Sequence, residues 1–155
     1  MGLPFSFAHH FGMGGTEMAL DAYRQSFRPS AILDAPYAMI GVPVVCAESR
    51  ERAEFLSAAS ALGFLRLRQG RPSQMPTPEE AASYDYSPAE RAMMDQRLRS
   101  AVLGPPEQVA SELQDLAEQF EVDELMLTTS THNPLDREES FSLVAKALLQ
   151  TPVPV

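Results

Sequence analysis

Two adjacent histidines, His9 and His10, end a short apolar and aromatic segment near the start of the chain. The composition of residues 3–11 predicts a β-strand, which places both imidazole rings at its carboxyl end. A neutral imidazole there can hydrogen-bond a ligand or help to move a proton. Because neighbouring strand residues point to opposite faces, we expect one ring to face the interior of the fold and the other ring to face a helix. The two rings could then not bind the same metal ion. The alternative interpretation is that backbone or helix groups satisfy both rings.

A second polar group, Thr128 and Thr129, closes an apolar strand predicted for residues 124–129. Hydroxyl groups at the end of a strand can orient the edge or the phosphate of a ligand through neutral hydrogen bonds. The alternative interpretation is that these hydroxyls cap the turn toward Asn133, since Ser and Thr are common in turns. The sequence leaves both interpretations open.

Three arginines, Arg66, Arg68 and Arg71, stand at the start of residues 66–86, most of which have no helical or strand periodicity. Structureless segments of this length are uncommon and are typical of lids and binding loops. We therefore predict a mobile lid whose arginines serve a substrate. The alternative is a solvated loop in which the arginines pair with nearby carboxylates: Glu79, Glu80 or Asp85.

Alternating strands and helices must position these polar groups. Three strands are predicted, over residues 3–11, 37–46 and 124–129, and the middle one is apolar on both faces, as in a parallel sheet covered on both sides. Alternation of this kind indicates parallel pairing with right-handed crossovers, so the fold class is α/β. Two helices are predicted in the first half of the chain, over residues 16–27 with Thr16 as N-cap and over residues 49–67. A third begins at a capping box at Ser87 and ends at about residues 102–104. Two more follow, one that begins at residues 105–107 and one after Asn133.

The predicted sheet is incomplete as a single chain. Three parallel strands leave two edges whose N–H and C=O groups have no partner, whereas an eight-stranded (β/α)8 barrel takes about 250 residues. We expect one domain over residues 1–150, followed by a loose tail over 151–155. We also expect the fold either to continue before residue 1 or to complete its sheet by pairing with another copy, as a homo-oligomer.

The composition excludes several classes of protein. The chain has 155 residues, with 12 Lys and Arg against 21 Asp and Glu, so its formal net charge is −9, which argues against nucleic acid as the main partner. No apolar run is long enough to span a membrane, and the N-terminus lacks the basic region of a signal peptide. A single cysteine, Cys46, cannot form an internal disulfide, and we expect it in the core of a cytoplasmic protein.

Several stretches, taken in order, resemble the C-terminal half of the bacterial luciferase-like, flavin-dependent monooxygenases. The stretches are residues 2–11 (GLPFSFAHHF), 19–30 (ALDAYRQSFRPS), 36–42 (PYAMIGV), 64–72 (FLRLRQGRP), 103–109 (LGPPEQV) and 123–129 (DELMLTT). The resemblance implies part of a TIM-type barrel, in which the three strands are the sixth, seventh and eighth. Flavin would sit at their carboxyl ends.

The resemblance also implies roles for particular residues. Ala8 and His9 would flank the flavin ring, with His10, Thr128 and Thr129 in the same binding site. Residues 66–86 would correspond to the mobile loop that covers the flavin pocket. The family's early strands, and much of its flavin-phosphate site, would precede residue 1.

Two hypotheses for function follow. The first is that the chain is part of a flavin-dependent monooxygenase, in which FMN, or a deazaflavin in some relatives, is reduced by a separate reductase and oxidises a small organic substrate with O₂. The second is a non-catalytic remnant, or a weak flavin-binding module, that folds by self-association. No pair of side chains in the sequence identifies a catalytic nucleophile or base, so the flavin would carry the chemistry.

Overall fold

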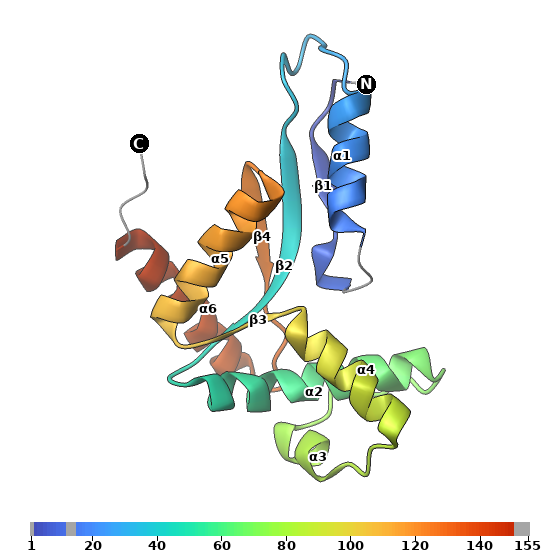
Figure 1. Ribbon diagram of the computed structural model, residues 1–155. Helices are drawn as coiled ribbons and strands as arrows, with labels where there is room; N and C mark the ends of the chain where they lie inside the picture. Colours follow the sequence, from blue (N-terminus) through green and yellow to red (C-terminus); the bar gives the residue numbers. More distant parts are fainter. Residues whose placement is uncertain (1, 12–14, 151–155) are drawn as a thin grey trace.

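The computed structural model describes residues 2–11 and 15–150 of the chain, so the predicted tail at 151–155 lies outside the described residues. The elements alternate between strand and helix (Figure 1). In chain order they are β1 (Phe5–Phe7), the 3-10 turn η1 (His9–Phe11), α1 (Thr16–Ser26), β2 (Ala38–Cys46), α2 (Arg50–Arg68), α3 (Pro78–Ser83), α4 (Pro88–Arg99), β3 (Val102–Gly104), α5 (Pro106–Phe120), β4 (Glu124–Thr128) and α6 (Pro134–Gln150).

Strand β2 is the centre of a parallel sheet. It pairs with β1 through Ala38–Ile40 and with β4 through residues 39–43, so β1 and β4 lie on opposite sides of it. Among the described residues, β1 and β4 each pair along one edge only. The predicted α/β class, the parallel pairing and the incompleteness of the sheet are therefore confirmed.

Two predicted elements were wrong in detail. Residues 102–104 were expected to end a helix, but they form the short strand β3, which pairs with residues 44–46 of β2. Helix α4 instead ends at Arg99. The strand β3 could not be predicted because its three residues are too few to give a periodic signal. The first strand was expected over residues 3–11, but it covers only Phe5–Phe7, because the chain then turns and the Phe11 amide donates to the Ala8 carbonyl.

One face of the sheet is covered by the helices α1, α5 and α6, which lie along the strands (Figure 1). Alternate residues of β2, from Ile40 through Val42 to Val44, are buried on this face, because a strand points every second side chain to the same side. Cys46 belongs to the same core, as expected, and burial raises the pKa of its thiol to about 11. On the neighbouring strand β4, Met126 is 52% exposed.

The helices α2, α3 and α4 form a separate layer beyond the carboxyl end of β2 (Figure 1). Ser87 and Glu90 form the predicted capping box at the start of α4. Within the expected lid, residues 66–86, the short helix α3 packs on α2 through Ala81, and Thr77 caps its N-terminus. Six residues with few buried apolar positions give too little periodicity to predict such a helix.

A buried hydrogen bond joins α6 to the central strand. The hydroxyl of Ser140, which is 0% exposed, accepts the backbone N–H of Cys46 at 2.9 Å. Replacing Ser140 by alanine is expected to lower the free energy of unfolding by about 1–3 kcal/mol, because the buried amide loses its acceptor. Urea denaturation measures this change. The exposed Ser142 on the same helix is the control, and an equal loss in both alanine variants would contradict the assignment.

None of the helices in the described ranges, residues 2–11 and 15–150, combines the length and apolar character needed to cross a bilayer.

Candidate functional site

A cavity of about 260 Å³ lies at the carboxyl ends of β2 and β4, against helices α2 and α4. In parallel α/β folds the carboxyl ends of the strands are where ligands bind. The side chains around it come from η1, both strands and both helices. The lining residues are His10, Pro43, Val44, Val45, Ser57, Ser60, Arg97, Ala101, Thr128 and Ser130.

His10 lines this cavity, and one of its ring nitrogens is buried without a partner. Its Nδ1 atom forms no hydrogen bond with any described residue, although it is shielded from solvent. The ring lies over Gly41 of β2, where a Cβ atom would stand 2.7 Å from Nδ1. Glycine at position 41 therefore makes room for the ring. Buried polar atoms are normally hydrogen-bonded, so this nitrogen, which is held against Gly41, is an exception among the described residues.

His9 points to the other side of the chain. Its Nδ1 atom lies 2.9 Å from the hydroxyl of Thr16, and its ring packs against Phe120 at 5.4 Å between centroids. Burial, with a smaller contribution from His10, lowers the pKa of His9, which favours its neutral form. The expected division of the two rings between a helix and the interior is confirmed. Thr16 was expected to be an N-cap, but Gly15 occupies that position, with φ of 82°, and Thr16 begins the helix.

The two threonines are also divided. Thr128 lines the cavity, and its hydroxyl donates a long hydrogen bond of 3.4 Å to the Val42 carbonyl. Thr129 is buried, and its hydroxyl donates to the Val44 carbonyl at 2.8 Å, which ties β4 to β2. Ala8, the remaining residue expected at the flavin, is exposed just before the η1 turn.

The arginines of the expected lid are dispersed. Arg66 forms an ion pair with Glu80 at 2.7 Å, as the solvated-loop alternative expects, and Arg71 donates to the side chain of Gln69. Arg68 lines a second cavity of about 200 Å³. The other residues around that second cavity are Phe11, Phe64, Met93, Gln96, Arg97 and Ser100. The mobility of residues 66–86 stays a prediction.

Sequence reasoning missed Arg97, which lines both cavities. Its guanidinium donates to the His10 carbonyl at 3.4 Å and stacks on the Phe64 ring at 4.2 Å from the centroid. Burial lowers its pKa. No local signal marks this residue, because Arg97 is one of several charged residues on α4, and residues 10 and 97 meet only through tertiary packing.

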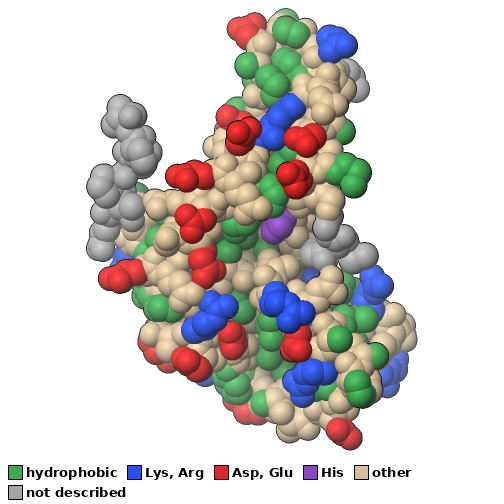
Figure 2. Space-filling view, in the orientation of Figure 1, with side chains coloured by type: hydrophobic (Ala, Val, Ile, Leu, Met, Phe, Trp, Pro, Cys, Tyr) green, Lys and Arg blue, Asp and Glu red, His purple; other side chains and the backbone are tan. Residues whose placement is uncertain are grey.

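Charge is unevenly distributed between the two parts of the molecule. Residues 50–99, which include α2, α3 and α4, contain eight Lys and Arg and seven Asp and Glu, whereas the rest of the chain contains four and fourteen. Figure 2 shows acidic side chains over α5 and several basic side chains over the region of α2 and α4. The layer beyond the strand ends is therefore much less repulsive to an anion than the rest of the surface.

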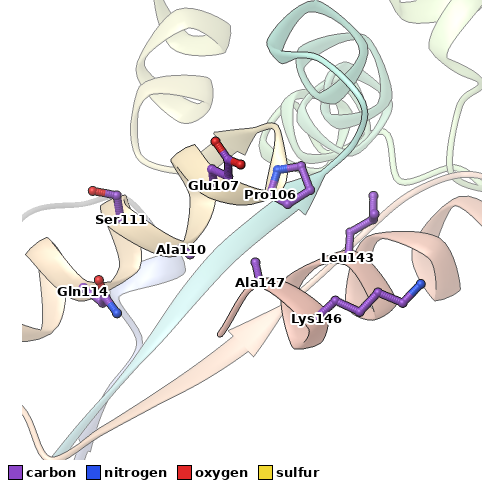
Figure 3. Close-up of a pocket in the computed structure, with 8 residues that line it drawn as sticks. All are labelled: Pro106, Glu107, Ala110, Ser111, Gln114, Leu143, Lys146 and Ala147. Atoms are coloured by element: carbon purple, nitrogen blue, oxygen red, sulfur yellow. The ribbon is translucent and has the colours of Figure 1, made fainter. Parts of the chain in front are cut away.

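A larger hollow, of about 520 Å³, lies elsewhere, between α5 and α6 (Figure 3). Its lining includes Glu107 and Lys146, and Figure 3 shows the Lys146 side chain extending along α6 rather than toward α5. The residues that line this groove all belong to α5 and α6. We therefore place the candidate site at the smaller cavity beside His10.

Comparison with known proteins gives several sequence relatives, although no protein-family model matches the chain. It is 41% identical over 145 residues to the uncharacterized protein YvbT of Bacillus subtilis, a match that covers 94% of this chain and 43% of YvbT. It is 35% identical over 143 residues to a luciferase-like monooxygenase of Escherichia coli K12, covering 92% of this chain and 43% of that protein. The chain thus spans less than half the length of these relatives.

Solved structures share the same arrangement. The crystal structure of apo-MsnO8 superposes with a TM-score of 0.81 at 30% identity, covering 98% of this chain and 46% of MsnO8. The oxygenating constituent of 3,6-diketocamphane monooxygenase from Pseudomonas putida, solved in complex with FMN, superposes with a TM-score of 0.51 at 12% identity, covering 99% of this chain and 50% of that one. The second likeness shows a shared fold alone.

Proposed function

Because this chain is homologous to the luciferase-like flavin-dependent monooxygenases and has the fold of about half of their barrel, we propose that it forms one wall of a flavin site. In this proposal the isoalloxazine edge lies at the cavity beside His10, at the carboxyl ends of β2 and β4. The whole protein would be an oxidoreductase acting on a small organic substrate. The observation that carries the proposal is the cavity at the carboxyl ends of β2 and β4, whose lining includes His10, Thr128 and Arg97.

Each residue at the cavity has a chemical task in this proposal. His10 would exchange one hydrogen bond with a flavin heteroatom through its imidazole ring, as donor or acceptor according to its tautomer. The Thr128 hydroxyl, whose bond to Val42 is long at 3.4 Å, would turn to donate to the ligand. Ala8, His9 and Thr129 would hold these groups in place from outside the cavity, since none of the three lines it.

A flavin, when bound, supplies the redox chemistry, and the protein orients it and limits access of water. Residues 66–86 would provide the cover, since α3 packs on α2, and Ser57 and Ser60 of α2 line the cavity. One contact already fixes this segment: Nδ1 of His132 lies 3.0 Å from the Met75 carbonyl, which joins the cover to the loop after β4.

FMN is the flavin to test first, because the diketocamphane monooxygenase constituent binds it. Replacing His10 by alanine is expected to raise the dissociation constant for FMN about tenfold, since one hydrogen bond to the ligand is worth about 1.5 kcal/mol at most between neutral groups. Replacing Thr128 by valine, which keeps the shape and removes the hydroxyl, is expected to raise it about fivefold. Quenching of flavin fluorescence on titration measures both constants.

The control is Ser142→Ala, because Ser142 is exposed on α6 and lies outside the cavity. Its dissociation constant for FMN is expected to equal that of the unmodified protein. Equal constants in all four proteins would refute the placement of the flavin beside His10. Failure of the unmodified protein to bind FMN, with the fold intact by circular dichroism, would count against a flavin site in this chain and favour the non-catalytic hypothesis.

A further inference from the structure

Arg97 lies between the cavity beside His10 and the second cavity, which is lined by residues of η1, α2 and α4. Among the described residues it alone lines both the cavity beside His10 and the second cavity next to Phe64. The second cavity combines an apolar surface, made by Phe11, Phe64 and Met93, with the cationic side chains of Arg68 and Arg97. An apolar pocket with a cation at one end is complementary to an amphiphilic anion.

The guanidinium of Arg97 is half-buried and has unused hydrogen-bonding capacity. An arginine carries five N–H donors, but the bond to the His10 carbonyl at 3.4 Å is long. Within residues 2–11 and 15–150, no carboxylate lies within ion-pair distance of Arg97, whereas Arg66 on the neighbouring helix pairs with Glu80. Burying a cation without a counter-charge is unfavourable, so a bound anion would stabilise this arrangement.

The Phe64 ring holds the guanidinium in place. The Arg97 Cζ atom lies 4.2 Å from the centroid of the Phe64 ring, and this stacking fixes the plane of the guanidinium group. Less side-chain freedom is therefore lost when an oxyanion binds to the edge of that group. The surrounding layer, residues 50–99, has nearly balanced charge, whereas the rest of the chain carries fourteen acidic and four basic residues. An anion that approaches the molecule therefore meets the least repulsion on this side.

We propose that Arg97 binds an oxyanion, a carboxylate or a phosphate, of a ligand whose apolar part lies against Phe64 and Met93. This inference deepens the proposed function, because Arg97 also lines the proposed flavin cavity. Two sources would present the same chemistry: the phosphate of FMN, or a carboxylate on the organic substrate. In either case the guanidinium edge forms charge-assisted hydrogen bonds with the two oxygen atoms.

Paired probes that differ in the anionic group test the proposal. FMN and riboflavin differ by the phosphate, while octanoate and 1-octanol share a chain length and differ in charge. Arg97→Gln is expected to raise the dissociation constant of the anionic member of one pair by at least about tenfold. The dissociation constant of the neutral member of that pair is expected to change by less than about twofold. Arg97→Lys keeps the charge but loses the planar, stacked guanidinium, so it is expected to restore only part of the affinity. Isothermal titration calorimetry measures all four probes.

Arg91→Gln is the matched control, because Arg91 lies on the same helix and stacks on an aromatic ring, Tyr86, at 4.3 Å, but lines neither cavity. It is expected to change no dissociation constant. A selective loss for FMN would assign the oxyanion to the flavin phosphate, and a selective loss for octanoate would assign it to a substrate carboxylate.

Three outcomes would overturn the inference: no preference for either anionic probe in the unmodified protein, an unchanged preference in Arg97→Gln, or an equal loss in Arg91→Gln. The octanoate pair also separates the two proposals. If FMN and riboflavin both fail to bind while octanoate still depends on Arg97, the flavin proposal fails and the anion site stands.

Discussion

Replacing Leu113 by alanine is expected to lower the free energy of unfolding by about 2–5 kcal/mol, because the change removes buried methyl groups and leaves a cavity. Leu113 lies on α5 and is 1% exposed, within the core that joins this helix to β2 and α6. The neighbouring side chains come from three separate elements, so they cannot collapse fully into the space. Urea denaturation followed by circular dichroism measures the change.

Leu149→Ala is the control for this prediction. The Leu149 side chain is 86% exposed on α6, and its truncation is expected to change the free energy of unfolding by less than about 0.5 kcal/mol. A similar loss in both variants would contradict the assignment of the core to the layer between α5, α6 and the sheet.

Replacing Gly41 by alanine is expected to raise the dissociation constant for FMN about tenfold, an effect of about 1.4 kcal/mol. A Cβ atom at position 41 would stand 2.7 Å from Nδ1 and 3.2 Å from Cε1 of His10, so the ring has to leave its position beside the cavity. The ring can rotate while the strand stays in place. We therefore expect the free energy of unfolding to change by less than about 1 kcal/mol.

Gly63→Ala is the matched control. Position 63 lies inside α2, where the added Cβ atom would meet only Pro76 Cδ at 3.4 Å, an ordinary contact. This substitution is expected to leave FMN binding unchanged and to stabilise the helix by about 0.5–1 kcal/mol, since alanine favours helix over glycine. If Gly41→Ala bound FMN as tightly as Gly63→Ala, the position of the His10 ring would have no bearing on the flavin.

Periodic sequence signals predicted the elements that repeat over many residues. The apolar run that became β2 and the helix predicted from residues 105–107 onward, which is α5, were correct, because each pattern extends over at least two turns or several strand pairs. The capping box at Ser87 was also readable, since its two hydrogen bonds involve residues three positions apart. Parallel pairing and the open edges followed from the order of these elements.

Short elements could not be predicted in the same way. β3 and α3 have three and six residues, and their stability comes from neighbours distant in sequence: β2 for the strand and α2 for the helix. The η1 turn ends the first strand two residues before His9, although residues 3–11 are uniformly strand-like in composition. Tertiary packing overrides local preference in each of these places.

The sequence by itself determined that imidazole and hydroxyl groups stand at the carboxyl ends of parallel strands, because strand order and chain direction follow from local pattern. Only the tertiary structure decided which member of each pair reaches the cavity: His10 and Thr128 line it, while His9 and Thr129 bond elsewhere. It also brought Arg97 to the carbonyl of His10. The physical reason is that side-chain direction beyond the end of a strand is set by packing against distant helices, which leaves no periodic trace in the sequence.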